Sequence, residues 1–186
     1  EKARRDLDTV SRNARILLKH VNDLLDVSKI EAGRMEVSYS DVDLVRHVRL
    51  LAANFETVAS ERHVQIAVDA PDSLRAEIDC EKMDRILLNL LSNAFKFVPE
   101  NGRVGLRLRR SDDGALLEVS DSGPGIPPDK REIVFERFRQ LEGGSNRRYG
   151  GTGLGLAIAR EMVELLRGSI LVGEAPGGGA LFTVRL

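Results

Sequence analysis

The chain has 186 residues and a formal net charge of −1 at pH 7, and 42% of its residues are hydrophobic. This length indicates one full domain with an appendage and enough apolar residues for a core, and the balanced charge excludes a general attraction to nucleic acid or acidic membranes. The single cysteine, Cys80, excludes an internal disulfide and a cysteine-based zinc site, and no apolar run approaches the ~20 residues of a membrane span.

Apolar residues near the N-terminus recur at spacings of three and four and predict a helix over about residues 4–32. They form a heptad stripe, and such a seam requires a partner helix. Gly33 is suited to end this helix, and residues 35–43 then act as a connector. We therefore place an appendage at residues 1–36 and the main domain at residues 41–186. The stripe consists of Leu7, Val10, Ala14, Leu17, Val21 and Leu24.

The main domain mixes amphipathic helices with alternating strands. Helices are predicted from Leu44 to Val58, from Met83 to Lys96 and after the glycine-rich segment that ends at Leu156. Strands are predicted at 64–68, 75–79, 103–109, 116–120, 169–172 and 180–186, with hairpin turns at Asp112 to Gly114 and Gly177 to Gly179. The fold class is α/β: a two-layer sandwich of a mixed, mainly antiparallel sheet with three helices on one face, preceded by the long N-terminal helix.

Residues Gly150 to Leu156 read Gly-Gly-Thr-Gly-Leu-Gly-Leu and open the last of these helices. Glycines let backbone N–H groups approach an anion, and the helix start adds unsatisfied donors and a positive dipole end. The segment therefore predicts a phosphate site, although its spacing matches neither the dinucleotide fingerprint nor a Walker loop. A glycine-rich loop without a ligand is the alternative.

Two further segments carry polar groups of the kind that bind nucleotides. Asp121 ends a strand and opens a second glycine turn, Asp121 to Ile126, although a turn-capping aspartate has the same pattern. Asn89, Asn93 and Lys96 share one face of an otherwise apolar helix. Amide oxygens can complete the coordination of Mg²⁺, and a lysine can neutralise a phosphate or extend along its helix into solvent.

These motifs, with the Phe-Glu-Arg-Phe segment at Phe135 to Phe138, occur in the order found in a known family. Over residues 41–186 the chain resembles the ATP-binding catalytic domain of sensor histidine kinases, in the superfamily of gyrase, the Hsp90 chaperones and MutL. Residues 12–33 resemble the second helix of the kinases' dimerisation and histidine-phosphotransfer domain.

The resemblance implies that Mg²⁺ and ATP bind here and that the γ-phosphoryl passes to a histidine, for relay to a response-regulator aspartate. Asn93 would be the magnesium ligand, Asn89 an accessory or water-bridged ligand and Lys96 a phosphate contact, and these three form the catalytic set. Asp121 would accept the adenine amino group, beside Phe97 as an aromatic wall. The implied ATP-binding set is Asn89, Asn93, Lys96, Phe97, Asp121, Gly123, Gly125, Ile126, Gly151, Thr152, Gly153, Leu154, Gly155 and Leu156.

The implied partners are a second copy, paired through the N-terminal helices, and a response-regulator receiver domain. Neither nucleic acid nor membrane contact is expected of this chain, and a cytoplasmic location is expected, including that of the cytoplasmic part of a membrane receptor. The family's acceptor histidine precedes an acidic residue, whereas His20, His47 and His63 each precede valine. Because the chain also begins at Glu1 without methionine, we expect a fragment whose acceptor lies upstream.

Residues 139–149 are polar and glycine-containing, which predicts a mobile lid whose Arg147 and Arg148 either meet the triphosphate or remain solvated. Phe135 and Phe138 are expected either in the core or at the base of this lid. Two other functions fit the motifs: an autonomous ATPase of the same superfamily, and a degenerate scaffold that only docks partners. Those ATPases carry a glutamate base four residues before the magnesium asparagine, where this chain has Asn89.

Overall fold

The computed structural model describes residues 2–112, 114–140 and 152–186. The chain divides into two compact units, Glu1–Glu36 and Val37–Leu186. Within the described residues, no helix has the length and apolar character needed to cross a membrane.

The first unit consists of helix α1, Lys2–Glu31. Five residues of the predicted stripe (Leu7, Val10, Leu17, Val21 and Leu24) are exposed by 44–69%. The helix ends as the sequence predicted: Gly33 has φ +62°, its N–H donates to Ile30 O, and Arg34 N donates to Lys29 O, both at 2.9 Å. This pair of bonds is the Schellman pattern, which satisfies two of the last carbonyls of a helix.

The second unit contains a five-stranded sheet in the order β2-β4-β5-β7-β6 and a two-stranded sheet of β1 and β3. The β2–β4 pair is parallel and the other pairs are antiparallel, which confirms the predicted mixed, mainly antiparallel sheet. The strands are β1 Ser40–Asp43, β2 Gln65–Asp69, β3 Arg75–Ile78, β4 Arg103–Ser111, β5 Gly114–Asp121, β6 Ser169–Glu174 and β7 Ala180–Arg185.

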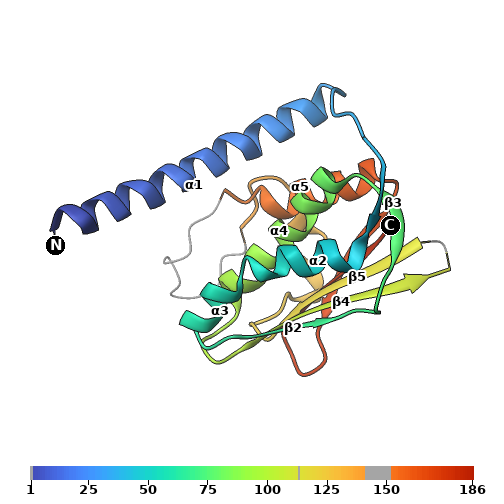
Figure 1. Cartoon of the computed structure of the whole chain (residues 1–186). Coiled ribbons are helices and arrows are strands. Elements are labelled where there is room, and N and C mark those ends of the chain that lie inside the picture. Colours follow the sequence, from blue (N-terminus) through green and yellow to red (C-terminus); the bar gives the residue numbers. More distant parts are fainter. Residues whose placement is uncertain (1, 113, 141–151) are drawn as a thin grey trace. The chain divides into compact units, whose positions relative to one another are not determined.

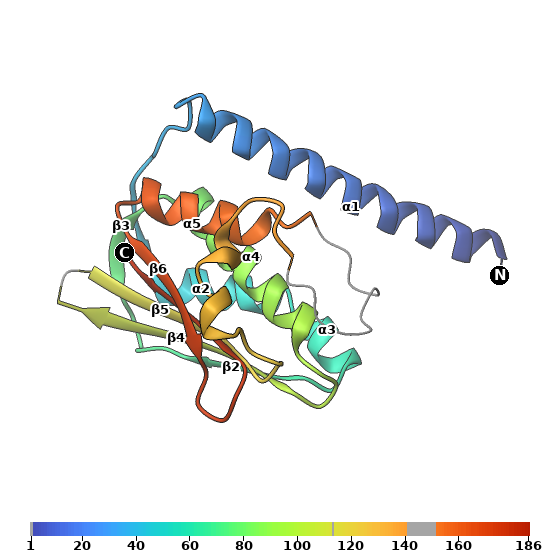
Figure 2. The ribbon, with the colours of Figure 1, turned by 180° about the vertical axis from the view of Figure 1, so that it is seen from behind.

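Helices cover one face of the larger sheet, so the unit has two layers, as predicted (Figure 1). The same arrangement is seen from behind in Figure 2, where α4 and α5 lie side by side over the strands. The helices are α2 Leu44–Ala53, α3 Glu56–Glu61, α4 Cys80–Phe97 and α5 Gly155–Leu165, with 3₁₀ turns at Pro128–Lys130 and Ile133–Phe135.

Two local predictions differ from the structure. The single helix predicted from Leu44 to Val58 is interrupted at Asn54 and Phe55, where the Phe55 ring stacks on Phe95 of α4 with centroids 5.1 Å apart. The connector predicted at 35–43 ends in a strand, because β1 finds its partner in β3 through the pairs Ser40↔Ile78 to Asp43↔Arg75.

The core lies between α4 and the sheet. Along β4 and β5 every second side chain points toward the helices. Each leucine buried there stabilises the fold by about 1.5–3 kcal/mol relative to an exposed one. Fully buried side chains include Ile86, Leu87, Leu90, Leu91, Leu106, Leu108, Leu117 and Phe182. This packing fixes α4, the helix that carries both site asparagines.

Asp79 begins α4 as its N-cap. Its Oδ1 accepts from Lys82 N at 3.1 Å, and its Oδ2 accepts from Ser38 N at 2.8 Å and lies 3.1 Å from Lys82 Nζ. Burial alone would raise the pKa of Asp79, but these three donors outweigh it and hold the pKa below its ordinary value. The carboxylate therefore anchors the segment before β1 to the start of α4.

Candidate nucleotide-binding site

The polar face of α4 lies against the beginning of α5. Asn89 is 7% exposed, while Asn93 and Lys96 are half-buried further along the helix. A Cβ built on Gly155, the first residue of α5, would lie 3.1 Å from Asn89 Oδ1. The structure thus brings the asparagine helix and the second glycine segment together, as a shared phosphate site requires.

The N-terminus of α5 presents backbone donors. Leu154, its N-cap residue, is fully buried and makes no side-chain cap, so donors of the first turn are open to an anion. Thr152 Oγ1 accepts from Leu154 N at 3.3 Å and shapes the approach to the helix, while Leu156 is half-buried in its first turn. Gly150 and Gly151 lie outside the described residues.

Gly153 has no room for a side chain. Its φ is +71°, and a Cβ there would lie 2.7 Å from the carbonyl carbon of Phe138. Phe138 N donates to Gly153 O at 3.0 Å, so the two backbones are in direct contact. This contact joins the phenylalanine segment to the glycine segment at the ends of the predicted lid.

Asp121 ends β5 and is 6% exposed. Burial raises the pKa of its carboxyl group, and hydrogen bonds from Gly123 N at 2.8 Å and Ala180 N at 3.4 Å oppose that rise. Both bonds end on Oδ1. The carboxylate is therefore held in one orientation, with hydrogen-bonding capacity beyond these two contacts.

The glycine turn after Asp121 packs against the end of α4. A Cβ on Gly123 would lie 2.8 Å from Asp121 Oδ1 and 3.0 Å from Phe97 O. The Phe97 ring is 47% exposed, and Lys96 Nζ lies 5.0 Å from its centroid. The turn therefore lies against the main chain of Phe97, and the exposed ring of the same residue lies beside the ammonium group of Lys96.

Several groups that shape the site were not identified from the sequence. Gly177 to Gly179 were predicted only as a turn, yet Gly179 lies against Asp121: its φ is +97° and a Cβ would lie 1.8 Å from Asp121 O. The next residue supplies the Ala180 N–H to the carboxylate. Gly125, with φ +71°, in turn approaches Gly179 O, at 3.1 Å from its Cβ position. Three consecutive glycines, more than a hairpin turn needs, were the available signal.

Arg131 also shapes the site, since its Nε donates to the carbonyl of half-buried Ile126 at 3.3 Å and holds the end of the glycine turn. No sequence motif indicated that Arg131, ten residues after Asp121, would contact Ile126.

The predicted lid at 139–149 lies outside the described residues except for Arg139 and Gln140, so Arg147 and Arg148 have no described position. At its base the two phenylalanines differ. Phe135 is buried and meets the Phe182 ring edge-on with centroids 6.2 Å apart, whereas Phe138 is 65% exposed with φ +62°. Phe135 is therefore a core residue, and Phe138 is the one that lies at the surface.

The donor set fits a magnesium ion carried by phosphates. The described residues contain no group of three His, Cys, Asp or Glu side chains that could hold a metal. Asn89, which the structure places beside the α5 start, is an amide, and its oxygen is a hard donor of the type Mg²⁺ accepts when phosphates and waters fill most of its shell.

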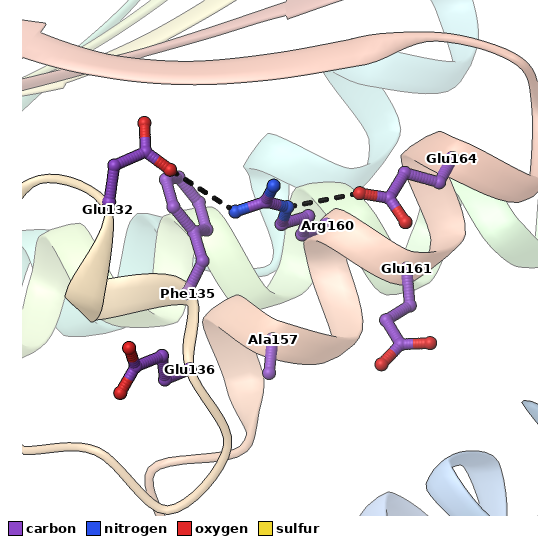
Figure 3. Close-up of a pocket in the computed structure, with 7 residues that line it drawn as sticks. All are labelled: Glu132, Phe135, Glu136, Ala157, Arg160, Glu161 and Glu164. Carbon is purple, nitrogen blue, oxygen red and sulfur yellow. Dashed lines mark hydrogen bonds and ion pairs between the residues drawn. The ribbon is translucent and has the colours of Figure 1, made fainter. Parts of the chain in front are cut away.

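A surface hollow of about 250 Å³ lies on another side of α5, between that helix and residues 132–136 (Figure 3). Arg160 crosses it, paired with Glu132 at 3.5 Å and Glu164 at 3.0 Å, and lies over the Phe135 ring. Glu161 pairs with Arg137 at 2.6 Å. The three carboxylates outnumber the two guanidinium groups, and the net negative charge disfavours a phosphate, so we assign the hollow no part in nucleotide binding.

A buried carboxylate beside a glycine turn and an uncapped helix start beside an asparagine lie on one α/β sandwich, an arrangement that suits a nucleotide-binding domain. The chain belongs to the family of histidine kinase-, DNA gyrase B- and HSP90-like ATPases, which matches residues 78–186. The resemblance proposed from the motifs is thereby confirmed.

Known relatives are sensor kinases. The sensor histidine kinase TmoS of Ectopseudomonas mendocina is 49% identical over 180 residues, covering 96% of this chain and 18% of the relative. Hybrid signal transduction histidine kinase D of Dictyostelium discoideum is 48% identical over 189 residues, which cover 98% of this chain and 12% of the relative. This chain thus spans less than a fifth of either relative.

Solved structures give the same fold. The crystal structure of full-length ShkA in complex with AMPPNP has a TM-score of 0.84 and 32% identity, covering 99% of this chain and 38% of that one. Histidine kinase ThkA in complex with response regulator protein TrrA has a TM-score of 0.70 and 23% identity, and the match covers 95% of this chain and 50% of that one.

Proposed function

We propose that the chain is the catalytic part of a two-component sensor histidine kinase, which binds Mg·ATP and transfers the γ-phosphoryl to a histidine for relay to a response-regulator aspartate. The observation that carries this proposal is the Asn89 carboxamide packed on Gly155 at the start of α5. A neutral amide cannot take a proton from water. A site with an amide there favours transfer to a protein acceptor over hydrolysis.

The proposed roles are those that the family resemblance implies, and the position of Asn89 beside Gly155 supports them. Asn93, with Asn89 as an accessory group, would hold Mg²⁺, which neutralises triphosphate charge when bound. Lys96 contacts phosphate, the amides of the α5 start receive the phosphate oxygens, and Asp121 accepts the adenine amino group. Phosphoryl transfer depends chiefly on positioning and charge neutralisation, so the site does not need a nucleophile of its own.

The acceptor is proposed to be a histidine other than the three in this chain. His20, His47 and His63 all precede valine, and His47 Nε2 lies 2.7 Å from Asp84 Oδ1, between α2 and α4. The proposed partners are a second copy, paired through α1, whose apolar stripe is exposed, and a response-regulator receiver domain, which the complex of ThkA with response regulator protein TrrA supports. Residues 1–36 would serve dimerisation, residues 41–186 would bind ATP, and the location would be cytoplasmic.

The proposal is tested by incubating the chain with γ-labelled ATP and Mg²⁺. The chain should bind the nucleotide without labelling itself. Addition of an acceptor domain with a histidine followed by an acidic residue should give acid-labile, alkali-stable label on that domain. The Asn93→Ala variant is the matched control and should transfer none. Acid-labile, alkali-stable label on the chain alone would contradict the assignment of its histidines.

A further inference from the structure

The C-terminal end of α4 is held by Arg62, which follows α3. Its Nη1 donates to Phe95 O and its Nη2 to Val98 O, the latter at 2.6 Å. The last four carbonyls of a helix have no intrahelical partner. Val98 N satisfies Ala94 O at 2.9 Å, and Arg62 satisfies the carbonyl of the next residue and that of the C-cap. The guanidinium thus bridges the last turn of α4 and the residue after it.

Arg62 is itself fixed by its backbone. Its N–H donates to Val58 O at 3.1 Å, and its carbonyl accepts from Asn101 N at 3.3 Å. The following residue turns the chain sharply, since His63 has φ +53°. Together with the Phe55–Phe95 ring stack, these contacts tie the α3 region to the end of α4. The guanidinium is therefore held in place by contacts that involve no nucleotide.

The C-terminal end of α4 is also the negative end of its helix dipole. A helix C-terminus carries about −0.5 of an elementary charge on its carbonyls, which disfavours nearby anions. Lys96 lies in this last turn, directly after the carbonyl that Arg62 binds. A guanidinium on these carbonyls offsets the negative end of the dipole beside the lysine.

We infer that Arg62 is a positioning residue for triphosphate binding: by bridging Phe95 O and Val98 O it fixes the last turn of α4 and aims Lys96 at the phosphates. This inference rests on the proposed function, because it takes Lys96 as the phosphate contact. Arg62 acts through Lys96 and does not touch the nucleotide.

The test is a double-mutant cycle on Mg·ATP affinity, measured by calorimetry with the whole chain. Arg62→Ala should weaken binding about tenfold, the equivalent of about 1.4 kcal/mol. Arg62→Lys should recover part of the loss, because it restores the charge without the two-pronged geometry. In the Lys96→Ala background, Arg62→Ala should cost about twofold or less, because the coupled partner is gone.

Arg109→Ala is the matched control. Arg109 also donates to a main-chain carbonyl, Leu108 O at 3.1 Å, but on β4, and its loss should leave affinity unchanged. Circular dichroism at the titration temperature verifies folding, and if Arg62→Ala is unfolded, Arg62→Lys is compared in both Lys96 backgrounds instead. Equal losses in the two backgrounds, or none, would overturn this inference alone. Wild-type chain that does not bind Mg·ATP would overturn the proposed function and this inference with it.

Discussion

Asn89 Oδ1 lies 3.1 Å from the position that a Cβ on Gly155 would occupy, so the amide lies beside the first residue of α5. This proximity joins the two halves of the proposed phosphate site, Asn89 and Gly155, which are 66 residues apart in the sequence. Glycine matters here for space and not for its backbone angle, since Gly155 begins a helix, its φ is not in the left-handed region, and a Cβ would make Asn89 shift by a few tenths of an ångström. A methyl group would press on the amide that is proposed to assist magnesium.

The first prediction follows from this contact. Gly155→Ala should weaken Mg·ATP binding by about 2- to 10-fold, the cost of disturbing one hydrogen bond of about 0.5–1.5 kcal/mol. Thermal stability should not fall, because alanine favours a helix. Gly173→Ala is the control, since a Cβ there meets nothing within 4 Å. Isothermal titration and thermal melts make the comparison, and an unchanged affinity for Gly155→Ala would show that Asn89 does not take part.

The second prediction concerns recognition of the base. Asp121→Ala should weaken ATP and ADP binding alike by roughly 10- to 150-fold, because a charged hydrogen bond worth about 1.5–3 kcal/mol is lost from a group common to both ligands. Asp69→Ala removes a half-exposed carboxylate of β2 that pairs with Arg107 and Arg109, and it should change neither affinity. If calorimetry shows Asp121→Ala binding ADP as wild type does, the adenine assignment is wrong.

A third prediction is a pH dependence of binding. The pKa of Asp121 is raised by burial, and a purine amino group prefers the ionised carboxylate as its acceptor. Binding therefore lowers that pKa, so affinity should rise with pH through a midpoint above the ordinary aspartate value of about 3.9 and then level off. Asp121→Asn keeps a hydrogen-bond acceptor but has no carboxyl group to titrate. The pH dependence of its ATP affinity therefore reports the phosphates, and subtracting it from the wild-type pH dependence leaves the contribution of Asp121. Identical profiles for wild type and Asp121→Asn would rule out ionisation of Asp121 as the cause.

Much of the fold was predictable because it depends on local periodicity. The spacing of Asn89, Asn93 and Lys96 placed them on one helix face, and Gly33 ended α1 where the sequence indicated. What was missed depends on distant partners. Strand β1 has only four residues and exists through its pairing with β3, and the break after α2 follows the stacking of Phe55 on Phe95.

The sequence predicts the principal groups of the site, which stay a prediction, but it does not indicate the contacts that support them. Local sequence identified Asp121, yet the N–H that Ala180 donates to it comes from 59 residues away. The contact of Gly179 with the Asp121 backbone likewise arises only when β5 and β7 are brought together. Such contacts are set by the sheet register, which no short motif encodes.

A fourth prediction separates the metal from the base. Asn93→Ala should abolish the gain in ATP affinity that Mg²⁺ provides, while leaving metal-free binding nearly unchanged, because an amide oxygen is lost from the magnesium shell. Asn54→Ala, at the C-cap of α2, is the control and should retain the full magnesium effect. Titrations with Mg²⁺ and with a chelator measure the difference. A normal magnesium effect in Asn93→Ala would place the metal on other groups.

The last prediction is that the chain hydrolyses ATP very slowly. Attack by water is helped by a group that accepts its proton, and the neutral amide of Asn89 cannot do this, whereas a carboxylate can. General-base help is typically ~10²- to 10⁴-fold, so its absence should leave turnover well below the median enzyme value of ~10 s⁻¹.

Substitution at the same position tests the cause of that slow turnover. Asn89→Ala should leave steady-state phosphate release low, because it removes no base. Asn89→Glu should raise it about tenfold or more, because the buried position brings a carboxylate with a raised pKa to the start of α5. A kinase benefits from the amide, since water would otherwise compete with the acceptor histidine for the phosphoryl group. A wild-type turnover near the median, unchanged in Asn89→Ala, would instead favour an autonomous ATPase in which another residue activates water.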